Sequence, residues 1–235
     1  MALISSAQSG SWNQPTTWVG GIVPNLSLDD VVVADHHTVT ADGGSRTLAG
    51  GRQITVSPQG MLEIRSGLTV QAGAALHALG TLAVRDVSSL SILGQMILDG
   101  TLLVHGASVV YVEPGGTLAI DGYASVEFYS TFLVGGTMRV GSLGALEILG
   151  SGMMGFDGQS RTDLLGSFRL FPDAYLYLGP DALVRVASSM DISGQMDSDG
   201  GRFVILRRES RINDADGDCL FVFDQAYGQE PRPIA

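Results

Sequence analysis

Apolar and polar residues alternate in short runs along most of this chain, and a glycine or proline ends almost every run. Examples are the stretches LTVQAG, ASVVYVEPGG and AYLYLGPDALVRV. Alternation of this kind places the apolar side chains on one face of a β-strand. No apolar stripe with helical spacing survives between the glycines, so the pattern predicts an all-β chain of short strands.

One phrase recurs along the middle of the chain: a glycine, a small or polar residue, an apolar residue, any residue and a second apolar residue. Copies of it begin at Gly60, Gly80, Gly100, Gly116, Gly136, Gly144 and Gly166. The first five copies are separated by steps of 20, 20, 16 and 20 residues. Short strands at a near-constant period are typical of a solenoid, whose stacked coils share one core. We expect a single-chain parallel β-helix over residues 31–206, with coils of about 20 residues.

An antiparallel β-sandwich is the alternative fold, because Asp-Gly pairs suited to tight hairpins recur along the chain. The return of the same phrase, rather than of hairpin turns alone, favours the solenoid. Stacked at ~4.8 Å, the expected coils would form a rod about 40 Å long. The two open ends of such a rod expose unpaired backbone groups and must be capped.

The two ends of the chain differ from the repeat. Residues 1–30 are predicted to form an N-terminal cap or arm, and they contain the only tryptophans, Trp12 and Trp18. Large aromatic side chains are well suited to close the apolar end of a rod. Residues 207–235 follow the apolar run FVIL and contain a second run, LFVF, so we predict a C-terminal hairpin cap and a tail.

The stretch SWNQPTTWVGGIVPNLSLDDVVV resembles the opening of G8-type domains and their bacterial and phage relatives. The matching positions are Trp12, Thr17, Trp18, Gly20, Gly21, Pro24, Asp30, Val31 and Val33. The resemblance covers residues 10–40 and implies a glycine-rich β-helical domain of the kind found in extracellular, adhesive and carbohydrate-linked proteins. The short leader is similar to versions in phage structural proteins. We expect Trp12, Trp18, Pro24 and Asp30 to form the structural cap.

The composition excludes several classes of protein. An apolar content of 45% is too high for a disordered chain. The net charge is −11 and all 13 basic residues are arginines, clustered only in the sequence RRESR, so we expect no nucleic-acid partner. No Sec signal peptide is visible, and no run approaches the 18 apolar residues of a membrane span.

Candidate metal sites and reactive groups are few, and we expect no cofactor. Asp214, Asp216 and Asp218 have the alternating spacing of a calcium loop, but Gln225 stands where an EF-hand needs glutamate. A polar turn is the alternative for these residues. The pair His36-His37, if in a strand, would point to opposite faces and could not share one metal. Cys219, the only cysteine, lies in an apolar run typical of a buried thiol.

Glycan cleavage would require two carboxylates at suitable separation, aligned in adjacent coils. The candidates are Glu63, Glu113, Glu127 and Glu147. Glu63 and Glu147 occupy the variable slot of the repeat phrase, where Arg139 and Arg169 also occur, which is typical of a surface position. We therefore expect no enzyme activity.

The tyrosines are candidate residues for binding a ligand or partner. They are Tyr111, Tyr123, Tyr129, Tyr175 and Tyr177. Facing outwards they would form a glycan-binding strip or an oligomer interface, and facing inwards they would be core.

The sequence thus favours a non-catalytic structural protein: a rigid rod serving as a virion component, such as a capsid decoration, fibre or attachment protein. Expected partners are virion proteins or other copies of the chain, for which a trimer is one arrangement. A carbohydrate-binding adhesin domain at a cell surface is the first alternative, and a small glycan-cleaving enzyme is the second.

Overall fold

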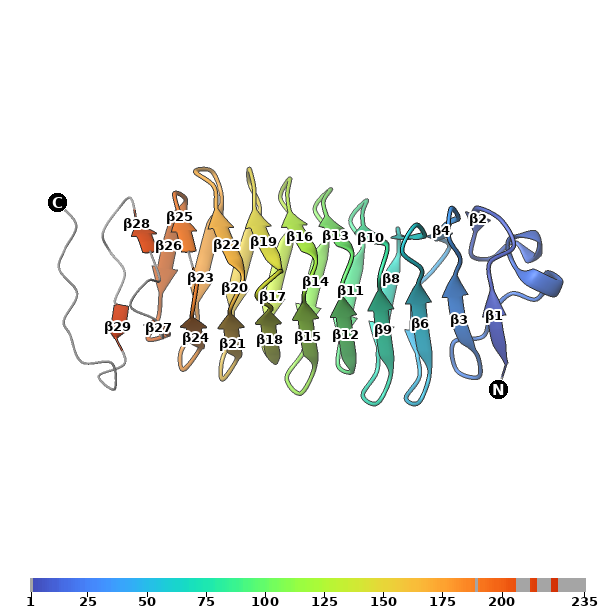
Figure 1. Ribbon diagram of the computed structural model, residues 1–235, viewed down its shortest axis with the longest axis horizontal. Helices are drawn as coiled ribbons and strands as arrows, with labels where there is room; N and C mark the ends of the chain where they lie inside the picture. The colour runs from blue at the N-terminus through green and yellow to red at the C-terminus, as the bar shows by residue number, and fades with distance from the viewer. Residues whose placement is uncertain (1, 189, 206–211, 215–220, 224–235) are drawn as a thin grey trace.

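The computed structural model describes residues 2–188, 190–205, 212–214 and 221–223 and shows an elongated all-β rod (Figure 1). Strands from successive coils lie side by side in three sheets along its length, and every named strand pairing is parallel. The predicted parallel β-helix is therefore confirmed, and the antiparallel sandwich is wrong.

Each full coil gives one strand to each sheet. In spatial order, the 11-stranded sheet consists of β1 (Leu3–Ser5), β3 (Asp30–Val33), β6 (Gln53–Val56), β9 (Ala75–Ala78), β12 (Gln95–Leu98), β15 (Thr117–Ile120), β18 (Thr137–Val140), β21 (Arg161–Leu164), β24 (Leu183–Val186), β27 (Arg202–Ile205) and β29 (Phe221–Phe223). The 10-stranded sheet consists of β2 (Gly10–Ser11), β4 (Thr38–Ala41), β7 (Met61–Ile64), β10 (Thr81–Val84), β13 (Thr101–Val104), β16 (Tyr123–Val126), β19 (Ala145–Ile148), β22 (Ser167–Leu170), β25 (Met190–Ile192) and β28 (Ile212–Asp214). The eight-stranded sheet consists of β5 (Arg46–Leu48), β8 (Gly67–Val70), β11 (Ser89–Ile92), β14 (Val109–Val112), β17 (Thr131–Val134), β20 (Met153–Phe156), β23 (Tyr175–Leu178) and β26 (Gln195–Ser198).

The coils are slightly longer and less regular than the repeat suggests. The successive register partners Gln95, Thr117, Thr137 and Arg161 are 22, 20 and 24 residues apart. The 16-residue step in the repeated phrase is not a coil at all. Gly100 precedes β13 in the 10-stranded sheet, whereas Gly116 precedes β15 in the 11-stranded sheet, so this step passes from one sheet to another.

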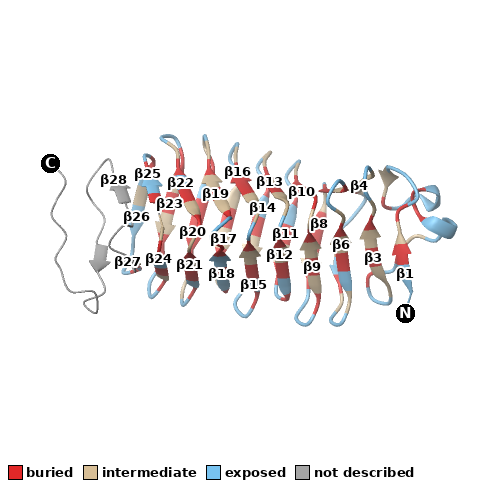
Figure 2. Ribbon diagram, in the orientation of Figure 1, coloured by how far each residue is buried: buried red, intermediate tan, exposed pale blue. Residues whose placement is uncertain are grey.

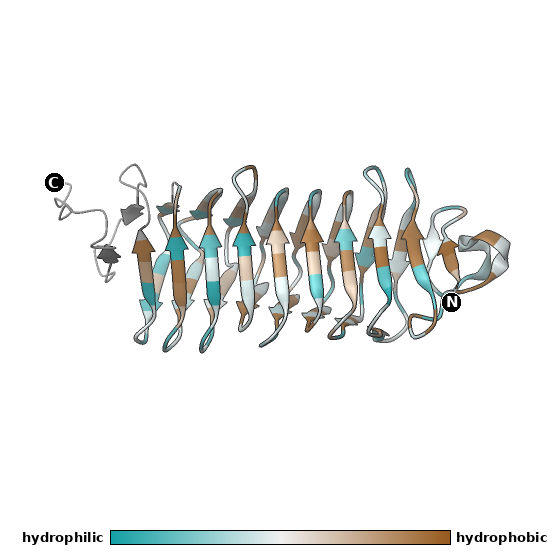
Figure 3. Ribbon diagram, turned by 60° about the horizontal axis from the view of Figure 1, so that its bottom comes forward, coloured by the Kyte–Doolittle hydropathy of each residue, from teal (hydrophilic) through white to brown (hydrophobic). Residues whose placement is uncertain are grey.

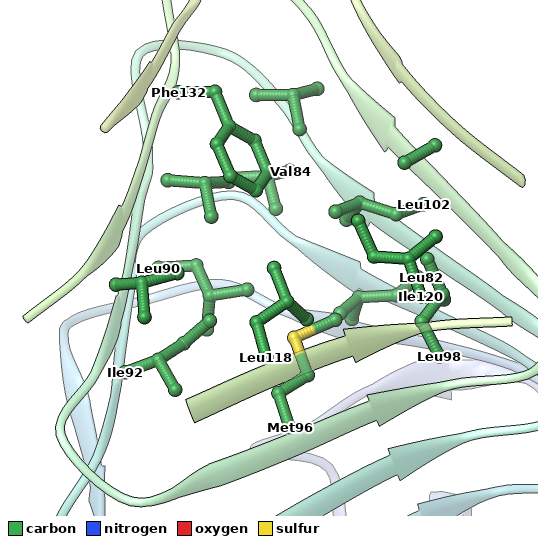
Figure 4. Packing of buried hydrophobic residues seen from close by; sticks show 14 of the residues in the cluster. Leu82, Val84, Leu90, Ile92, Met96, Leu98, Leu102, Leu118, Ile120 and Phe132 are labelled. Carbon is green, nitrogen blue, oxygen red and sulfur yellow. The ribbon is translucent and has the colours of Figure 1, made fainter. Parts of the chain in front are cut away.

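The core fills the space enclosed by the three sheets. The second and fourth residues of most strands are buried, and their side chains meet from all three directions (Figures 2 and 4). Leu82 of β10, Leu90 of β11 and Met96 of β12 are wholly inaccessible to solvent, and Phe132 of β17 fills the same space two coils beyond Leu90. Burial of one continuous apolar column is what stabilises coils that could not fold alone.

The outward positions carry a changing set of residues. Hydropathy alternates along the strands of the 11-stranded sheet, which faces the viewer in Figure 3. In the 10-stranded sheet, one outward position is occupied coil by coil by Thr40, Glu63, Ala83, Leu103, Ser125, Glu147, Arg169 and Asp191. Inward positions are thus restricted to core residues, while outward positions tolerate every chemical type.

Six glycines form a column along the rod, each directly before a strand of the 10-stranded sheet, and they allow adjacent coils to approach closely. Its members are Gly60, Gly80, Gly100, Gly122, Gly144 and Gly166. A Cβ atom added at any of them would collide with backbone carbonyl groups, mostly those of the preceding coil. Ser188 takes the next place in this column, and its hydroxyl donates a hydrogen bond to the carbonyl of Gly166.

The first residues close the N-terminal end of the core. Trp12 and Trp18 are buried with their ring centroids 4.8 Å apart, and the indole N–H of Trp18 donates to the carbonyl of Trp12 at 2.7 Å. Two short 3-10 helices, η1 (Pro15–Thr17) and η2 (Val19–Gly21), lie in this segment. Pro24 is also buried, and a carboxylate oxygen of Asp30 accepts the backbone N–H of Gln53 at 2.9 Å.

The apolar runs expected to form a C-terminal hairpin do not pair as one. β27 and β29 lie next to each other in parallel, whereas a hairpin requires antiparallel strands. The chain between them contributes β28 to the 10-stranded sheet, so it passes through part of another coil before returning. The remainder of residues 207–235, including Cys219, Asp216 and Asp218, lies outside the described residues.

Candidate functional site

Three of the five predicted tyrosines gather on the outer face of the eight-stranded sheet. Tyr111 lies on β14, and Tyr175 and Tyr177 lie on β23, three coils further along the rod. All three side chains are half-buried. Register places Leu133 and Gly155 between Tyr111 and Tyr177 in a single outward column. We call the outward residues of β14, β17, β20 and β23 the tyrosine face.

Two glycines, one within the tyrosine face and one beside it, leave space that neighbouring side chains occupy. A Cβ atom at Gly155 would be 2.8 Å from Cδ2 of Leu133, so the Leu133 side chain lies over this glycine. A Cβ atom at Gly135 would be 2.8 Å from the hydroxyl of Tyr111, so that ring leans over the edge of the next coil. Leu133 and Tyr111 therefore lean along the sheet towards the following coil.

Carboxylates border this surface near two of its tyrosines. The hydroxyl of Tyr175 donates to Asp197 at 2.7 Å, and this bond raises the pKa of Tyr175. Burial, followed by the charges of Glu113 and Asp157, raises the pKa of Tyr111. The face therefore combines ring surfaces with hydroxyl groups and nearby acceptors, which are the groups that contact sugars or a protein partner.

The other two tyrosines lie elsewhere. Tyr123 is on β16 of the 10-stranded sheet, where its hydroxyl donates to Glu147 at 2.8 Å. Burial and this hydrogen bond raise the pKa of Tyr123 to about 12. Tyr129 lies in the turn between β16 and β17 and is highly exposed. The structure therefore does not bring the five predicted residues into one site.

The four candidate carboxylates all have partners on the rod surface. Ser91 donates to Glu113 at 2.8 Å, and Ser125 donates to Glu127 at 3.1 Å. Glu147 accepts from Tyr123 and also approaches a guanidinium nitrogen of Arg169 at 3.4 Å.

Glu63 is the most buried of the four, although it occupies an outward slot. Its carboxylate accepts Nε of Arg65 at 3.0 Å and Oγ1 of Thr40 at 3.3 Å, and it lies 3.4 Å from Nε of Arg85. Ala83, the register partner of Glu63 in the next coil, is fully buried although its slot also points outwards. The cluster joins neighbouring coils by ion pairing.

One pair of aligned carboxylates lies outside the four predicted candidates. Asp99 and Asp121 occupy the same register in adjacent coils, directly after β12 and β15. They turn away from each other. Asp99 binds Nε2 of His77 at 2.7 Å in the preceding coil, while the carboxylate of Asp121 lies over Gly141 in the following coil. Two Asp-Gly turns at matching positions were the sequence signal for this alignment.

The histidine pair is in a turn rather than a strand. His36 has a positive φ of 63°, and Nδ1 of His37 lies 2.8 Å from the hydroxyl of Ser6. The expected strand geometry is therefore wrong, because the turn between β3 and β4 already includes these residues. Within the described part of the chain, no group of three or more metal-ligating side chains is arranged to hold an ion. Of the calcium candidates only Asp214 is described, as the last residue of β28.

Comparison of the chain with protein-family models, with curated proteins and with solved structures yields no match. The resemblance of residues 10–40 to G8-type domains stays a prediction. No helix among the described residues is long and apolar enough to cross a membrane.

Proposed function

We propose that the protein is a non-catalytic structural rod that serves as a component of a virion, as a decoration, fibre or attachment protein. The main support for a structural role is the difference between the inward and the outward positions of the strands. Inward positions hold an apolar core through about eight coils, with Thr162 as a polar member, while outward positions vary freely. A chain organised in this way specifies a rigid shape rather than one repeated ligand site.

Links between coils on the surface support the same role. The guanidinium of Arg185 pairs with Asp163 at 2.5 and 2.6 Å, and these residues occupy the same outward slot in adjacent coils. Tyr175 and Asp197, and His77 and Asp99, also join neighbouring coils. Each pair contributes little by itself at an exposed site, but each connects two adjacent coils.

The viral part of the proposal rests on the sequence resemblance and is tested by locating the protein. Virus particles purified from the organism that encodes the chain should contain it in a fixed ratio to the major capsid protein, measured by quantitative mass spectrometry. Recovery in the cell-envelope fraction, with none in the particles, would contradict the viral role while leaving the structural role intact.

Binding of a neutral glycan is the second candidate, and the tyrosine face favours it. Aromatic rings with nearby carboxylate acceptors suit the apolar faces and hydroxyl groups of sugars. On a glycan array, the wild-type protein should bind a defined subset of sugars, and Tyr177→Ala should abolish that binding. Tyr123→Ala, on another sheet, is the matched control and should retain it. Equal binding by both variants would exclude this face.

A further inference from the structure

The turns that lead into the eight-stranded sheet form a ridge along one corner of the rod. Register aligns Val87, Ala107, Tyr129 and Ser151 in successive coils, each two residues before a strand partner in the sheet. Backbone bonds join the turns: Val87 N–H donates to Gly106 at 2.9 Å, and Ala107 N–H donates to Phe128 at 3.1 Å. We call these four positions, with Phe128, the corner ridge.

The backbone of the corner ridge is strained for the side chains that it carries. Val87, Phe128 and Tyr129 have φ values of 62°, 50° and 62°. A left-handed backbone is costly for β-branched and bulky residues and favours glycine. The position of Phe128 is indeed held by Gly106 and Gly150, with φ values of 75° and 52°, in the coils on either side.

Buried serines hold these turns in place. Ser88, Ser108 and Ser130 follow the ridge residues directly and are almost inaccessible to solvent. The N–H of Ser88 donates to Oγ of Ser108 at 3.3 Å, and the N–H of Ser108 donates to Oγ of Ser130 at 3.3 Å. A strained backbone persists only where its surroundings fix it in this way, and such strain is often associated with function.

The strained side chains remain largely exposed in the single chain. Val87, Phe128 and Tyr129 are exposed to 79%, 64% and 75%. Together with Val109 and Met153 on the adjoining strands, they offer roughly 500 Å² of mostly apolar surface, taking about 200 Å² for a whole aromatic side chain. One partner of a standard protein interface buries about 800 Å², of which a little over half is non-polar. The patch therefore has the apolar area that one side of a stable dimer needs.

We propose that the corner ridge is the interface of a homodimer in which two rods lie antiparallel. Side-chain size alternates along the ridge, because Val87 and Tyr129 are large while Ala107 and Ser151 are small. A two-fold axis between the coils of Ala107 and Tyr129 sets each Tyr129 against Ala107 of the second copy. The same axis sets each Val87 against Ser151, so every large side chain meets a small one, as an isologous contact requires. Parallel rods in register would place large on large.

The same two-fold axis also brings complementary polar groups beside the ridge to the same level. His105 and Glu127 directly follow β13 and β16 and occupy the same register in adjacent coils. Reversal about the axis therefore brings His105 of one copy to the level of Glu127 of the second copy. An imidazole and a carboxylate are complementary hydrogen-bonding groups, and the contact is formed twice in the dimer.

The first experiment measures mass and stability together. Sedimentation equilibrium of the full chain should give twice the chain mass of 24.6 kDa. The double variant Phe128→Gly, Tyr129→Asn should weaken the dimer at least about tenfold. Its monomer should melt no lower than wild type at a concentration where both are monomeric, because glycine and asparagine tolerate this backbone. Leu143→Asn, at an 89% exposed site on another corner, is the control and should leave the dimer unchanged.

The second experiment tests the direction of the two rods by disulfide trapping in a Cys219→Ser background. Val87→Cys with Ser151→Cys should give a cross-linked dimer on oxidation. An internal disulfide is excluded, because the two sites are three coils, or about 14 Å, apart. Val87→Cys alone should stay uncross-linked. A monomeric wild type, a dimer that survives the ridge variant, or efficient trapping by Val87→Cys alone would each overturn the proposal.

Discussion

Replacing Gly100 by alanine tests the close approach of coils on which the glycine column depends. A Cβ atom at Gly100 would lie 2.6 Å from the carbonyl carbon of Leu79, and closer still to the carbonyl oxygens of Leu79 and Gly80. All of these atoms belong to the backbone of the preceding coil, so none can rotate away. Overpacking of this kind typically costs about 1–3 kcal/mol. In a domain of this size, each kcal/mol lowers Tm by about 2–4 °C, so a fall of about 2–12 °C is expected.

Gly155→Ala is the matched control for this prediction. Neither glycine has a positive φ, but the added atom at Gly155 would meet only Cδ2 of Leu133, the end of a flexible side chain. Reduced freedom of the unfolded chain favours alanine here by about 0.4–1 kcal/mol, which offsets the movement of Leu133. Thermal unfolding followed by circular dichroism should therefore separate the two variants clearly. Equal melting temperatures would refute the argument that backbone contact between coils dictates these glycines.

Three further changes test the core, the surface ion pairs and the tyrosine titration. Phe132→Ala removes a fully buried ring and should cost about 3–5 kcal/mol, measured by urea unfolding. Glu63→Ala leaves Arg85 without its adjacent carboxylate and should cost about 1.5–3 kcal/mol in the same assay, with Glu63→Gln less harmful. Tyr123, with its pKa raised to about 12, should ionise about two pH units above the ordinary phenol value near 10 in an absorbance titration. Because that pKa lies above the unfolded value near 10, stability should fall between about pH 10 and 12, and Tyr123→Phe should lessen this fall.

Each of these predictions has a control on the same molecule. Leu143→Ala, at an exposed site, should leave the urea midpoint unchanged, and a loss equal to that of Phe132→Ala would contradict the core assignment. An unchanged midpoint for Glu63→Ala would show that the cluster around it is fully solvated. Tyr129→Phe should leave the late ionisation in place, so its disappearance in that variant would assign the raised pKa to the wrong residue.

The fold could be predicted from the sequence because each strand carries its own signal. In the phrase that begins at Gly80, Leu82 and Val84 are two residues apart, which fixes their common inward direction whatever the neighbouring coils do. The glycine at the start of the phrase was a further signal, although its role in coil contact needs coordinates. Direction of pairing followed from repetition, since stacked identical units are parallel.

Side-chain contacts between coils could not be predicted from the sequence, because the coil length varies. Register partners are 20 residues apart at Thr117 and Thr137 but 24 apart at Thr137 and Arg161. Contacts are also diagonal, since the hydroxyl of Tyr123 bonds to Glu147, two residues beyond its register partner Ala145. An error of two residues in register shifts a side chain to a different outward position, so a fixed period of 20 cannot identify these pairs. The same uncertainty prevented the five tyrosines from being assigned to separate sheets. The left-handed backbone at Phe128 was equally hidden, since glycine was the only turn residue whose conformation could be inferred.

The corner ridge contrasts with the outward side chains that are paired with an adjacent coil. Asp163, Glu147 and Asp197 are each paired with a neighbouring coil, which is how a rod stabilises itself without external contacts. At Phe128 and Tyr129 the situation is reversed, since large side chains occupy an unfavourable backbone and remain in water. Glycine and asparagine at these positions would make the single chain more stable, because both tolerate a positive φ. A sequence that keeps aromatic residues there is therefore best explained by a surface that covers them, and the alternating profile of the ridge makes a second copy the simplest such surface.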